Sequence, residues 1–306
     1  MFNEKSMERV RSLLTTITPP GAINLALYAK HIILHEPVEW AYMPDGWRSQ
    51  LNPNVKGWNV ESVLHAYEAN WSSFVTSLEG SQPLGVTLTR PLPTHLDFLS
   101  HNTLVSYGYA LAIASRRKTA ISMLDWGGGI GHYYLISQAL LPDLQIDYHC
   151  KDVPLLASKG QSLFPDTHYY ADDTCLARQF DFVLASSSLQ YSEGWTSVLA
   201  KLSHATGGYI FVTRLPIIHK ADSFVAIQRP YRYGYGTEYL GWCFNRVEFL
   251  ECAKTQGLEL IREFIIGEQP AIRHAPEQCE YRGYLFRSQS QEISGVSTGG
   301  DARSAI

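Results

Sequence analysis

Three glycines at alternate positions, Gly127, Gly129 and Gly131, follow an apolar run that ends in Asp125. Glycine has no Cβ atom and adopts positive φ angles readily, so a chain with this spacing can bring its backbone close to a bound molecule. The helix expected after the glycines begins with N–H groups that lack helical partners, and these groups can bind a polar ligand. The residues therefore predict a ligand-binding turn between a strand and a helix.

The spacing of the glycines distinguishes two classes of cofactor. A dinucleotide-binding turn has the pattern Gly-x-Gly-x-x-Gly, with its last glycine close to a pyrophosphate. Counted from Gly127, that last position is His132. The pattern here, Leu-Asp-x-Gly-x-Gly-x-Gly, resembles motif I of the class I S-adenosylmethionine-dependent methyltransferases. The resemblance implies S-adenosylmethionine as the cofactor, with Gly127, Gly129 and Gly131 around its methionine portion and Asp125 near the loop and its amino group.

An acid at the end of the next expected strand is the second feature. Residues 145–150 are expected to form this strand, and Asp152 follows, 23 residues after Gly129. That separation is close to the roughly 20 residues of a strand-helix-strand unit. A carboxylate accepts two hydrogen bonds at once, so Asp152 is predicted to bind both ribose hydroxyls. The alternative is a solvated acid at a strand end, before the turn signal Val153-Pro154.

Further polar residues follow two more expected strands. Residues 167–170 are expected to form a short strand, and Asp172 and Asp173 come directly after it. The resemblance implies an acid here that binds the adenine amino group; Asp172 is the better candidate, although adjacent acids are also typical of a solvated loop. A buried strand from Phe180 ends in small polar residues and resembles the family's fourth motif, which faces cofactor and substrate. Ser187 is the cofactor-binding candidate at this strand end.

No residue is distinguished by the sequence as a general base. The sulfonium of the implied cofactor carries an activated methyl group, so transfer needs mainly alignment of the acceptor and sometimes a base. The catalytic candidates are Tyr191 and Glu193, after the fourth strand, and His132, after the glycine loop; for the histidine a structural or solvated role is the alternative. The Asn/Asp-Pro-Pro-aromatic signature of amino-group methyltransferases is absent where residues 186–189 stand. This absence favours an oxygen acceptor.

A long insertion separates the fifth expected strand, residues 209–213, from a helix expected to begin at Arg246. It is far longer than the usual connection of a few residues. Long loops at the carboxyl end of a parallel sheet are where substrates bind. The candidates for acceptor contact are Arg214, His219, Tyr233 and Trp242. Tyrosine and arginine are also enriched in protein interfaces, so an acceptor site and a homodimer interface both stay open.

The order of the expected elements predicts an α/β protein. Residues 119–287 alternate strands and helices in the manner of a doubly wound, mostly parallel sheet. The resemblance implies a Rossmann-like methyltransferase fold of seven strands, in which residues 258–266 and 280–286 form an antiparallel pair that places the final strand inside the sheet. Residues 288–306 are rich in serine and glycine and are expected to be a disordered tail.

Residues 1–118 are expected to be a mainly helical N-terminal region that acts as a lid or contributes to the substrate site. Its clearest helix is expected after Asn59, a plausible N-cap, and another over residues 94–115. Tyr67 and Trp71 lie on one face of the first helix at helical spacing. This face is either part of the core or an aromatic platform for the substrate.

Composition limits the possible partners. The chain of 306 residues has 25 basic and 29 acidic residues and a formal net charge of −4, which gives no basic footprint for nucleic acid or an anionic membrane. No stretch approaches the roughly 18 apolar residues of a membrane span, and the N-terminus has acids where a signal peptide would have basic residues. The sequence predicts a cytoplasmic protein. Five cysteines without a CxxC pair suggest neither a zinc site nor a disulfide framework, and no metal is predicted.

Three classes of function remain after these steps. The first is a methyltransferase that uses S-adenosylmethionine on a small-molecule or glycan acceptor. In this class, the glycine-loop segment and the runs Ser-Ser-Ser-Leu-Gln-Tyr and Trp-x-Phe-Asn are similar to a little-characterised bacterial group that is associated with surface-polysaccharide biosynthesis. The second is an NAD(P)-dependent Rossmann enzyme, against which His132 argues. The third is a non-catalytic protein of the same fold that binds cofactor or a partner.

Overall fold

The computed structural model describes residues 38–81, 98–267 and 269–289. The expected start of the tail at residue 288 is wrong, because Ser288 is buried and ends the last strand of the sheet. The rest of the expected tail from residue 290, the first 37 residues and residues 82–97 lie outside the described residues.

Among the described residues there is one sheet of eleven strands, and seven of them form its central part and confirm the predicted fold class. Every neighbouring pair of these seven is parallel except those of β11, which lies between β6 and β9 and is antiparallel to both. The antiparallel final strand inside the sheet is the arrangement that the resemblance implies. In spatial order the strands are β4 (His168–Tyr170), β3 (Gln145–Lys151), β2 (Ala120–Trp126), β5 (Phe180–Ser186), β6 (Thr206–Ile218), β11 (Glu280–Ser288) and β9 (Leu258–Ile265).

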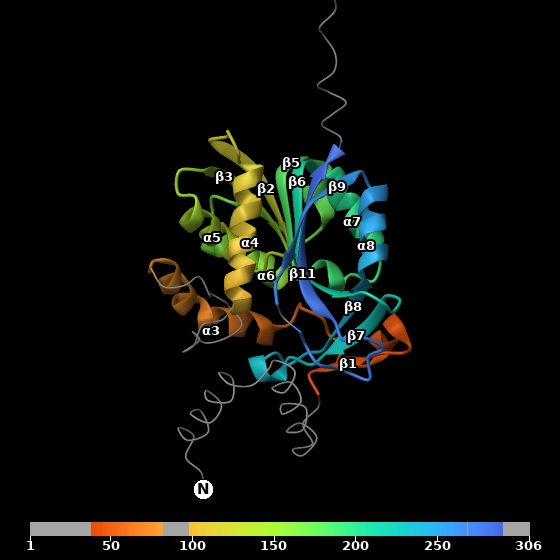
Figure 1. Cartoon of the computed structure of the whole chain (residues 1–306). Helices are drawn as coiled ribbons and strands as arrows, with labels where there is room; N and C mark the ends of the chain where they lie inside the picture. The colour runs from red at the N-terminus through yellow and green to blue at the C-terminus, as the bar shows by residue number, and fades with distance from the viewer. Residues whose placement is uncertain (1–37, 82–97, 268, 290–306) are drawn as a thin grey trace, which may run out of the picture.

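Helices cover both faces of this sheet (Figure 1). Successive side chains of a strand point to opposite faces, and β5 shows the result: Phe182 and Leu184 join one apolar core, whereas Val183 and Ala185 join the other. The first core packs against α4 (Phe98–Ala114), α5 (His132–Leu140) and α6 (Pro154–Leu163). The second packs against α7 (Trp195–His204) and α8 (Arg246–Thr255).

The expected insertion continues the sheet, so the predicted end of the fifth strand at residue 213 is wrong. Strand β6 runs to Ile218 because its last residues pair with β8. The insertion then forms an antiparallel hairpin of β7 (Phe224–Gln228) and β8 (Tyr239–Asn245). Strand β1 (Trp40–Tyr42) pairs with β7, and β10 (Ile272–Arg273) with β1. The N-terminal region thus adds a strand as well as helices.

Helix α3 (Glu61–Leu78) lies at the carboxyl end of the parallel strands, together with the β1-β7-β8 extension (Figure 1). Its N-cap is Val60 rather than the expected Asn59. The side-chain oxygen of Asn59 instead accepts a hydrogen bond from the backbone N–H of Leu155, at 3.1 Å, in the first turn of α6. The ring of Trp71 packs on Phe74 and the first core, as the core alternative predicts. None of the described helices has both the length and the apolar character needed to cross a membrane.

One carboxylate ties the amino-terminal ends of β2 and β5 together. Asp181 accepts hydrogen bonds from the Lys118 ammonium (2.6 Å) and from the backbone N–H and hydroxyl of Ser122 (2.8 and 3.0 Å). Burial raises the pKa of Asp181, but the bonds from Lys118 and Ser122 outweigh this effect and hold the pKa below its ordinary value. The ionised form is therefore the one that stabilises the fold.

We expect Asp181→Asn to lower the free energy of unfolding at neutral pH by about 1 kcal/mol, because a charged hydrogen-bond acceptor is lost. A lowered native pKa gives stability above about pH 4 that disappears as the carboxylate is protonated at lower pH. The difference in the free energy of unfolding between wild type and variant should therefore be smaller at about pH 3 than at neutral pH. Urea denaturation at both pH values measures it, with Asp143→Asn in the exposed α5–β3 turn as the matched control. An equal effect of the two variants at neutral pH would contradict this role.

Candidate functional site

The predicted glycine loop joins β2 to α5 and has the backbone conformation that its glycines allow. The φ angles of Gly127, Gly129 and Gly131 are 76°, 63° and 91°, a region that residues with a Cβ atom rarely adopt. The N–H of Gly127 donates to the Lys151 carbonyl of β3 at 2.8 Å. A Cβ atom on Gly131 would lie 1.9 Å from the Tyr169 hydroxyl. The loop is thus closely packed at both ends.

Asp125 lies beneath this loop and is completely buried. One carboxyl oxygen accepts a hydrogen bond from the Tyr148 hydroxyl at 2.6 Å, and the other, Oδ1, has no hydrogen-bond partner among the described residues. Burial raises the pKa of Asp125 to about 7. A buried hydrogen-bond acceptor without a donor is uncommon in native proteins. The positively charged N–H group of a ligand bound at the loop would supply a donor for Oδ1 of Asp125.

The motif does not require a glycine at position 128, but the packing of the structure does. Gly128 occupies a variable position in the pattern, and its φ angle is not positive. A Cβ atom on Gly128 would nevertheless lie 2.4 Å from Oδ2 of Asp125 and 2.8 Å from Sγ of Cys150. Both neighbours are completely buried and cannot move away easily. Only the tertiary packing reveals this constraint.

Asp152 is brought to the glycine loop, as the sequence predicts. Its Oδ2 accepts a hydrogen bond from the N–H of Gly129 at 2.7 Å, and its Oδ1 from the N–H of Val153 at 2.6 Å. Burial raises the pKa of Asp152, while the two backbone N–H groups act in the opposite direction. Each carboxylate oxygen can accept a second hydrogen bond. The residue can therefore position the loop and bind hydroxyl groups at the same time.

Two residues of neighbouring strands hold left-handed backbone conformations: one directly follows β5 and the other lies within β6. Ser187 and Arg214 both have φ angles of 52°, and such conformations of non-glycine residues are often found at functional sites. The register of β6 against β11 shifts at Arg214, opposite Gly283, so this is a β-bulge that redirects the side chain. The side-chain amide of Gln190 donates to the Ser187 hydroxyl and to the Arg214 carbonyl, at 3.1 and 3.4 Å.

Gln190 links Arg214 to the end of β5, and the charge of Arg214 acts on groups at the start of α5. Burial lowers the pKa of His132 to about 4, and the charge of Arg214 contributes. Burial also raises the pKa of Tyr133 to about 12, with Arg214 opposing it. The Tyr133 hydroxyl lies 2.8 Å from that of Ser186, at the end of β5. The structure thus brings His132, Arg214 and the β5 strand end together, with a neutral imidazole at neutral pH.

An aromatic cluster, here Trp58, Tyr67, Tyr191, Tyr235 and Tyr239, adjoins the glycine loop. The Trp58 ring stacks on Tyr239, with ring centroids 4.1 Å apart, and meets the edge of Tyr191 at 5.1 Å. The Tyr67 ring lies 3.1 Å from where a Cβ atom of Gly129 would be. Nε1 of Trp58 and the hydroxyl of Tyr239 are buried and lack hydrogen-bond partners within the described part of the chain. Tyr191 is one of the catalytic candidates from the sequence. Tyr67 is a possible substrate contact, and Tyr235 and Tyr239 belong to the insertion expected to contact an acceptor or a second subunit.

Of the remaining candidates, Tyr233 lies beside this cluster, whereas Trp242 and Glu193 contact each other outside it. The Tyr233 ring lies 6.2 Å from that of Tyr235. The Trp242 ring packs on Trp47, and its Nε1 donates to the carbonyl of Glu193, whose own side chain is exposed. Residues three apart on a strand face opposite sides, so Tyr239 of β8 is in the cluster and Trp242 is not.

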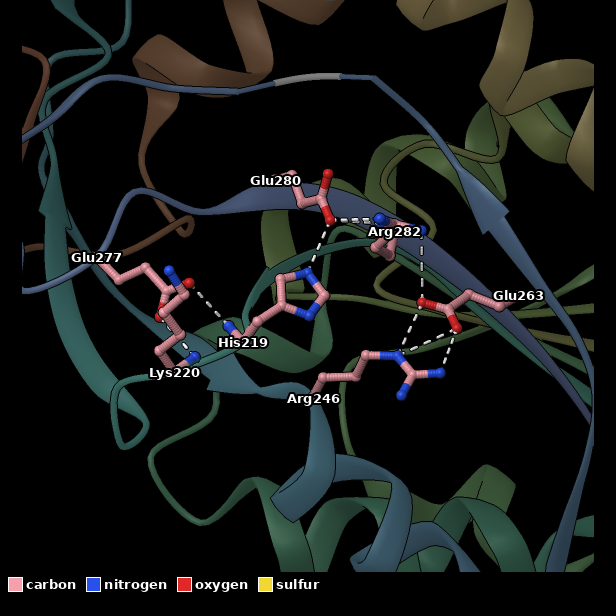
Figure 2. A network of polar contacts seen from close by, with 7 residues as sticks. All are labelled: His219, Lys220, Arg246, Glu263, Glu277, Glu280 and Arg282. Atoms are coloured by element: carbon pink, nitrogen blue, oxygen red, sulfur yellow. Dashed lines mark hydrogen bonds and ion pairs between the residues drawn. The ribbon is translucent and has the colours of Figure 1, made fainter.

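His219 is not brought to the glycine loop by any contact of its side chain. Its ring bonds Glu280 of β11 at 2.8 Å, within an ion-pair network that also joins Arg282, Glu263 and Arg246 (Figure 2). The carboxylate of Glu277 accepts the backbone N–H groups of residues 219–221. These contacts indicate a structural role in fixing the turn between β6 and β7.

Asp172 lies in the loop after β4. Its carboxylate caps the short helix η2 (Asp173–Ala177) by accepting hydrogen bonds from the N–H and hydroxyl of Thr174, at 3.0 and 2.5 Å. Asp172 and Asp173 are both exposed. The roles assigned to Asp172 and to the other site candidates stay predictions, as does a homodimer interface.

Gly128→Ala is expected to lower the free energy of unfolding by about 2 kcal/mol or more, because the methyl group would overlap the buried Asp125 carboxyl. Urea denaturation measures the loss. Gly194→Ala is the matched control, since a Cβ atom there would meet nothing within 4 Å. If both variants were as stable as the wild type, the inference that Gly128 is closely packed against Asp125 would be contradicted.

Comparisons with known proteins find distant likenesses among solved structures only. No family model matches the chain, and no curated protein matches it in sequence. Among solved structures, a S-adenosylmethionine-dependent methyltransferase from Clostridium acetobutylicum is 12% identical, with a TM-score of 0.42, over 63% of this chain and 92% of that one. The N-terminal domain of EvdMO1, solved with SAH and D-fucose, is 13% identical, with a TM-score of 0.45, over 72% and 97%. The [4+2]-cyclase SpnF is 14% identical, with a TM-score of 0.43, over 73% and 96%.

The assignment of the fold therefore rests on the molecule itself. The strand order, the antiparallel β11 between β6 and β9, and the glycine loop after β2 are all present. The chain has the fold of the class I S-adenosylmethionine-dependent methyltransferases.

Proposed function

We propose that the protein transfers a methyl group from S-adenosylmethionine to a hydroxyl oxygen of a small-molecule or glycan acceptor. One observation carries the proposal: the carboxylate of Asp152 is hydrogen-bonded to the N–H of Gly129, inside a loop of glycines with positive φ angles. This arrangement leaves acceptor capacity for ribose hydroxyls beside backbone that a ligand can approach closely.

The donor set at the carboxyl end of the sheet fits this cofactor. Asp152 would hold the ribose, and the glycine loop would surround the methionine portion. The unpartnered Oδ1 of Asp125, an orphan within the described residues, suits the positively charged amino group of the ligand. Asp172 in the loop after β4 is the candidate for the adenine amino group. The bound cofactor would supply an activated methyl group on a sulfonium.

The start of α5 favours this cofactor over a dinucleotide. A dinucleotide fingerprint places a glycine where His132 stands. The His132 ring lies against Tyr133 and Phe74, with ring centroids 4.6 and 6.2 Å apart. Close approach of a pyrophosphate to the helix N-terminus needs the space that this ring occupies.

The aromatic cluster supports a hydroxylated acceptor. The buried Nε1 of Trp58 can only donate a hydrogen bond, whereas the Tyr239 hydroxyl can donate or accept. Burial raises the pKa of the Tyr67 and Tyr239 hydroxyls, so both stay protonated at neutral pH. These groups can orient an acceptor that carries hydroxyls, but they cannot remove its proton.

His132, the first residue of α5 after the glycine loop, is the candidate that could receive the proton of the acceptor. Burial lowers its pKa to about 4, so the imidazole is neutral at neutral pH. Its pKa of about 4 makes it a weak base. We therefore assign most of the rate to alignment of the acceptor and only a supporting role to His132.

The test of the cofactor is calorimetric titration with S-adenosylmethionine, S-adenosylhomocysteine and NAD. We expect micromolar binding of the first two ligands and none of NAD. Gly129→Val should abolish binding because the side chain would meet the Tyr67 ring, and Asp152→Ala should weaken it at least about tenfold, or about 1.4 kcal/mol. Asp143→Asn, in an exposed turn, should bind like the wild type. Binding of NAD alone, or of no ligand, would refute the proposal.

A second measurement distinguishes an enzyme from a protein that only binds the cofactor. The protein is incubated with methyl-labelled S-adenosylmethionine and a panel of hydroxylated small molecules and sugars. If the wild type transfers label to one of these acceptors and the Trp58→Phe and Tyr239→Phe variants do not, the protein is an enzyme and the aromatic cluster is its acceptor site. Tight cofactor binding without label in any acceptor would favour a binding protein of the same fold.

The raised pKa of Asp125 predicts how cofactor affinity depends on pH. The carboxyl group is neutral below about pH 7 and ionised above it, and only the ionised form attracts the amino group of the ligand. Affinity for S-adenosylmethionine should therefore rise when the pH is raised through about 7. Asp125→Asn should bind more weakly and lose this rise, as measured by titration at both pH values. The same rise in the variant would show that another group is responsible.

A further inference from the structure

We propose that Asp147, His149 and His168 form a binding site for a divalent transition-metal ion of the Zn²⁺ type on the outer edge of the sheet. Asp147 and His149 lie two residues apart on β3, so their side chains share one face. His168 of the edge strand β4 is directly opposite His149 in the strand register. Three side chains of the types that bind such ions are thus gathered by two adjacent strands.

The distances between the donor atoms suit a single ion. Oδ1 of Asp147 lies 3.1 Å from Nε2 of His149 and 3.5 Å from Nε2 of His168, and the three ligand atoms all lie within 4.8 Å of one another. In a tetrahedral site with bonds of about 2.0–2.1 Å, neighbouring ligand atoms are about 3.3 Å apart. The two imidazole rings are stacked, with centroids 4.3 Å apart. A small movement of the exposed His168 ring would complete the geometry.

Second contacts hold two of the three ligands in place. The Nδ1 atom of the buried His149 lies 2.9 Å from the Tyr170 hydroxyl, so its Nε2 is directed at Asp147. The second oxygen of Asp147 accepts a hydrogen bond from Arg178 at 3.1 Å. Histidine and carboxylate ligands of metals are usually oriented by hydrogen bonds of this kind. Asp147 and His168 are exposed, which gives an ion access from solvent.

The site would reinforce a short edge strand of the sheet. Strand β4 has three residues and only β3 as a neighbour. An ion that binds both strands would therefore cross-link this edge. The Tyr170 carbonyl of β4 accepts the N–H of Asp152 at 3.1 Å, so the cross-link would also steady the residue proposed to bind the cofactor. The proposal does not depend on the function assigned above, because the three ligands stand apart from the glycine loop.

Titration of the tag-free, chelator-treated protein with Zn²⁺ tests the site, together with the visible spectrum of the Co²⁺-loaded protein. We expect saturable binding of one ion per chain, a raised melting temperature and the intense d–d bands of a low-coordinate Co²⁺ site. His168→Ala and Asp147→Ala, both exposed positions, should weaken binding at least tenfold and remove the bands. His204→Ala, at another exposed histidine, should leave both unchanged.

Two outcomes would overturn the inference. One is the absence of saturable one-to-one binding in the wild type. The other is equal binding in the wild type and His168→Ala. Titration with S-adenosylmethionine is run on the same variants to confirm their folding and to separate failure of the metal site from failure of the proposed cofactor site.

Discussion

The hydrogen bond between the Asp152 carboxylate and the Gly129 N–H is the contact on which the candidate site depends. It joins the end of β3 to the loop that follows β2, two strands that are adjacent in the sheet. A hydrogen bond from a backbone N–H to a charged acceptor is stronger than one between neutral groups. It fixes a loop whose glycines have no side chains to pack. Asp125, at the end of β2 before the loop, is held by the Tyr148 hydroxyl.

The extension of the sheet beyond β6 determines what surrounds this loop. The β7–β8 hairpin and the segment before α3 bring Trp58 and Tyr239 into contact. The bulge in β6 includes Arg214, whose charge acts on His132 at the start of α5. These features cost backbone strain and leave polar atoms buried without partners inside the described region. Such costs are usual where a protein binds a ligand and unusual in a region that serves only stability.

Two neighbouring parts of the sheet carry different chemistry. The carboxyl ends of β2 and β3 are followed by acids and glycines that suit an organic cofactor. Within β3 and the edge strand β4, two imidazoles and a carboxylate form a donor set for a metal ion. Tyr170 connects the two, since its hydroxyl contacts His149 and its carbonyl contacts Asp152. An effect of metal on cofactor affinity would pass through this residue.

The sequence by itself determined the features that depend on local conformation. Gly127, Gly129 and Gly131 were identifiable because positive φ angles demand glycine, and Asp152 because a strand-helix-strand unit has a nearly fixed length. Tertiary structure decided the features that depend on contacts between distant segments. Gly128 is needed because a Cβ atom there would also meet Cys150 of the neighbouring strand β3. Tyr239 rather than Trp242 joins the aromatic cluster because β6 continues and pairs with β8, and His168 meets His149 only across two strands. Periodicity and spacing describe a chain one segment at a time, whereas register and packing between segments arise only when the whole sheet forms.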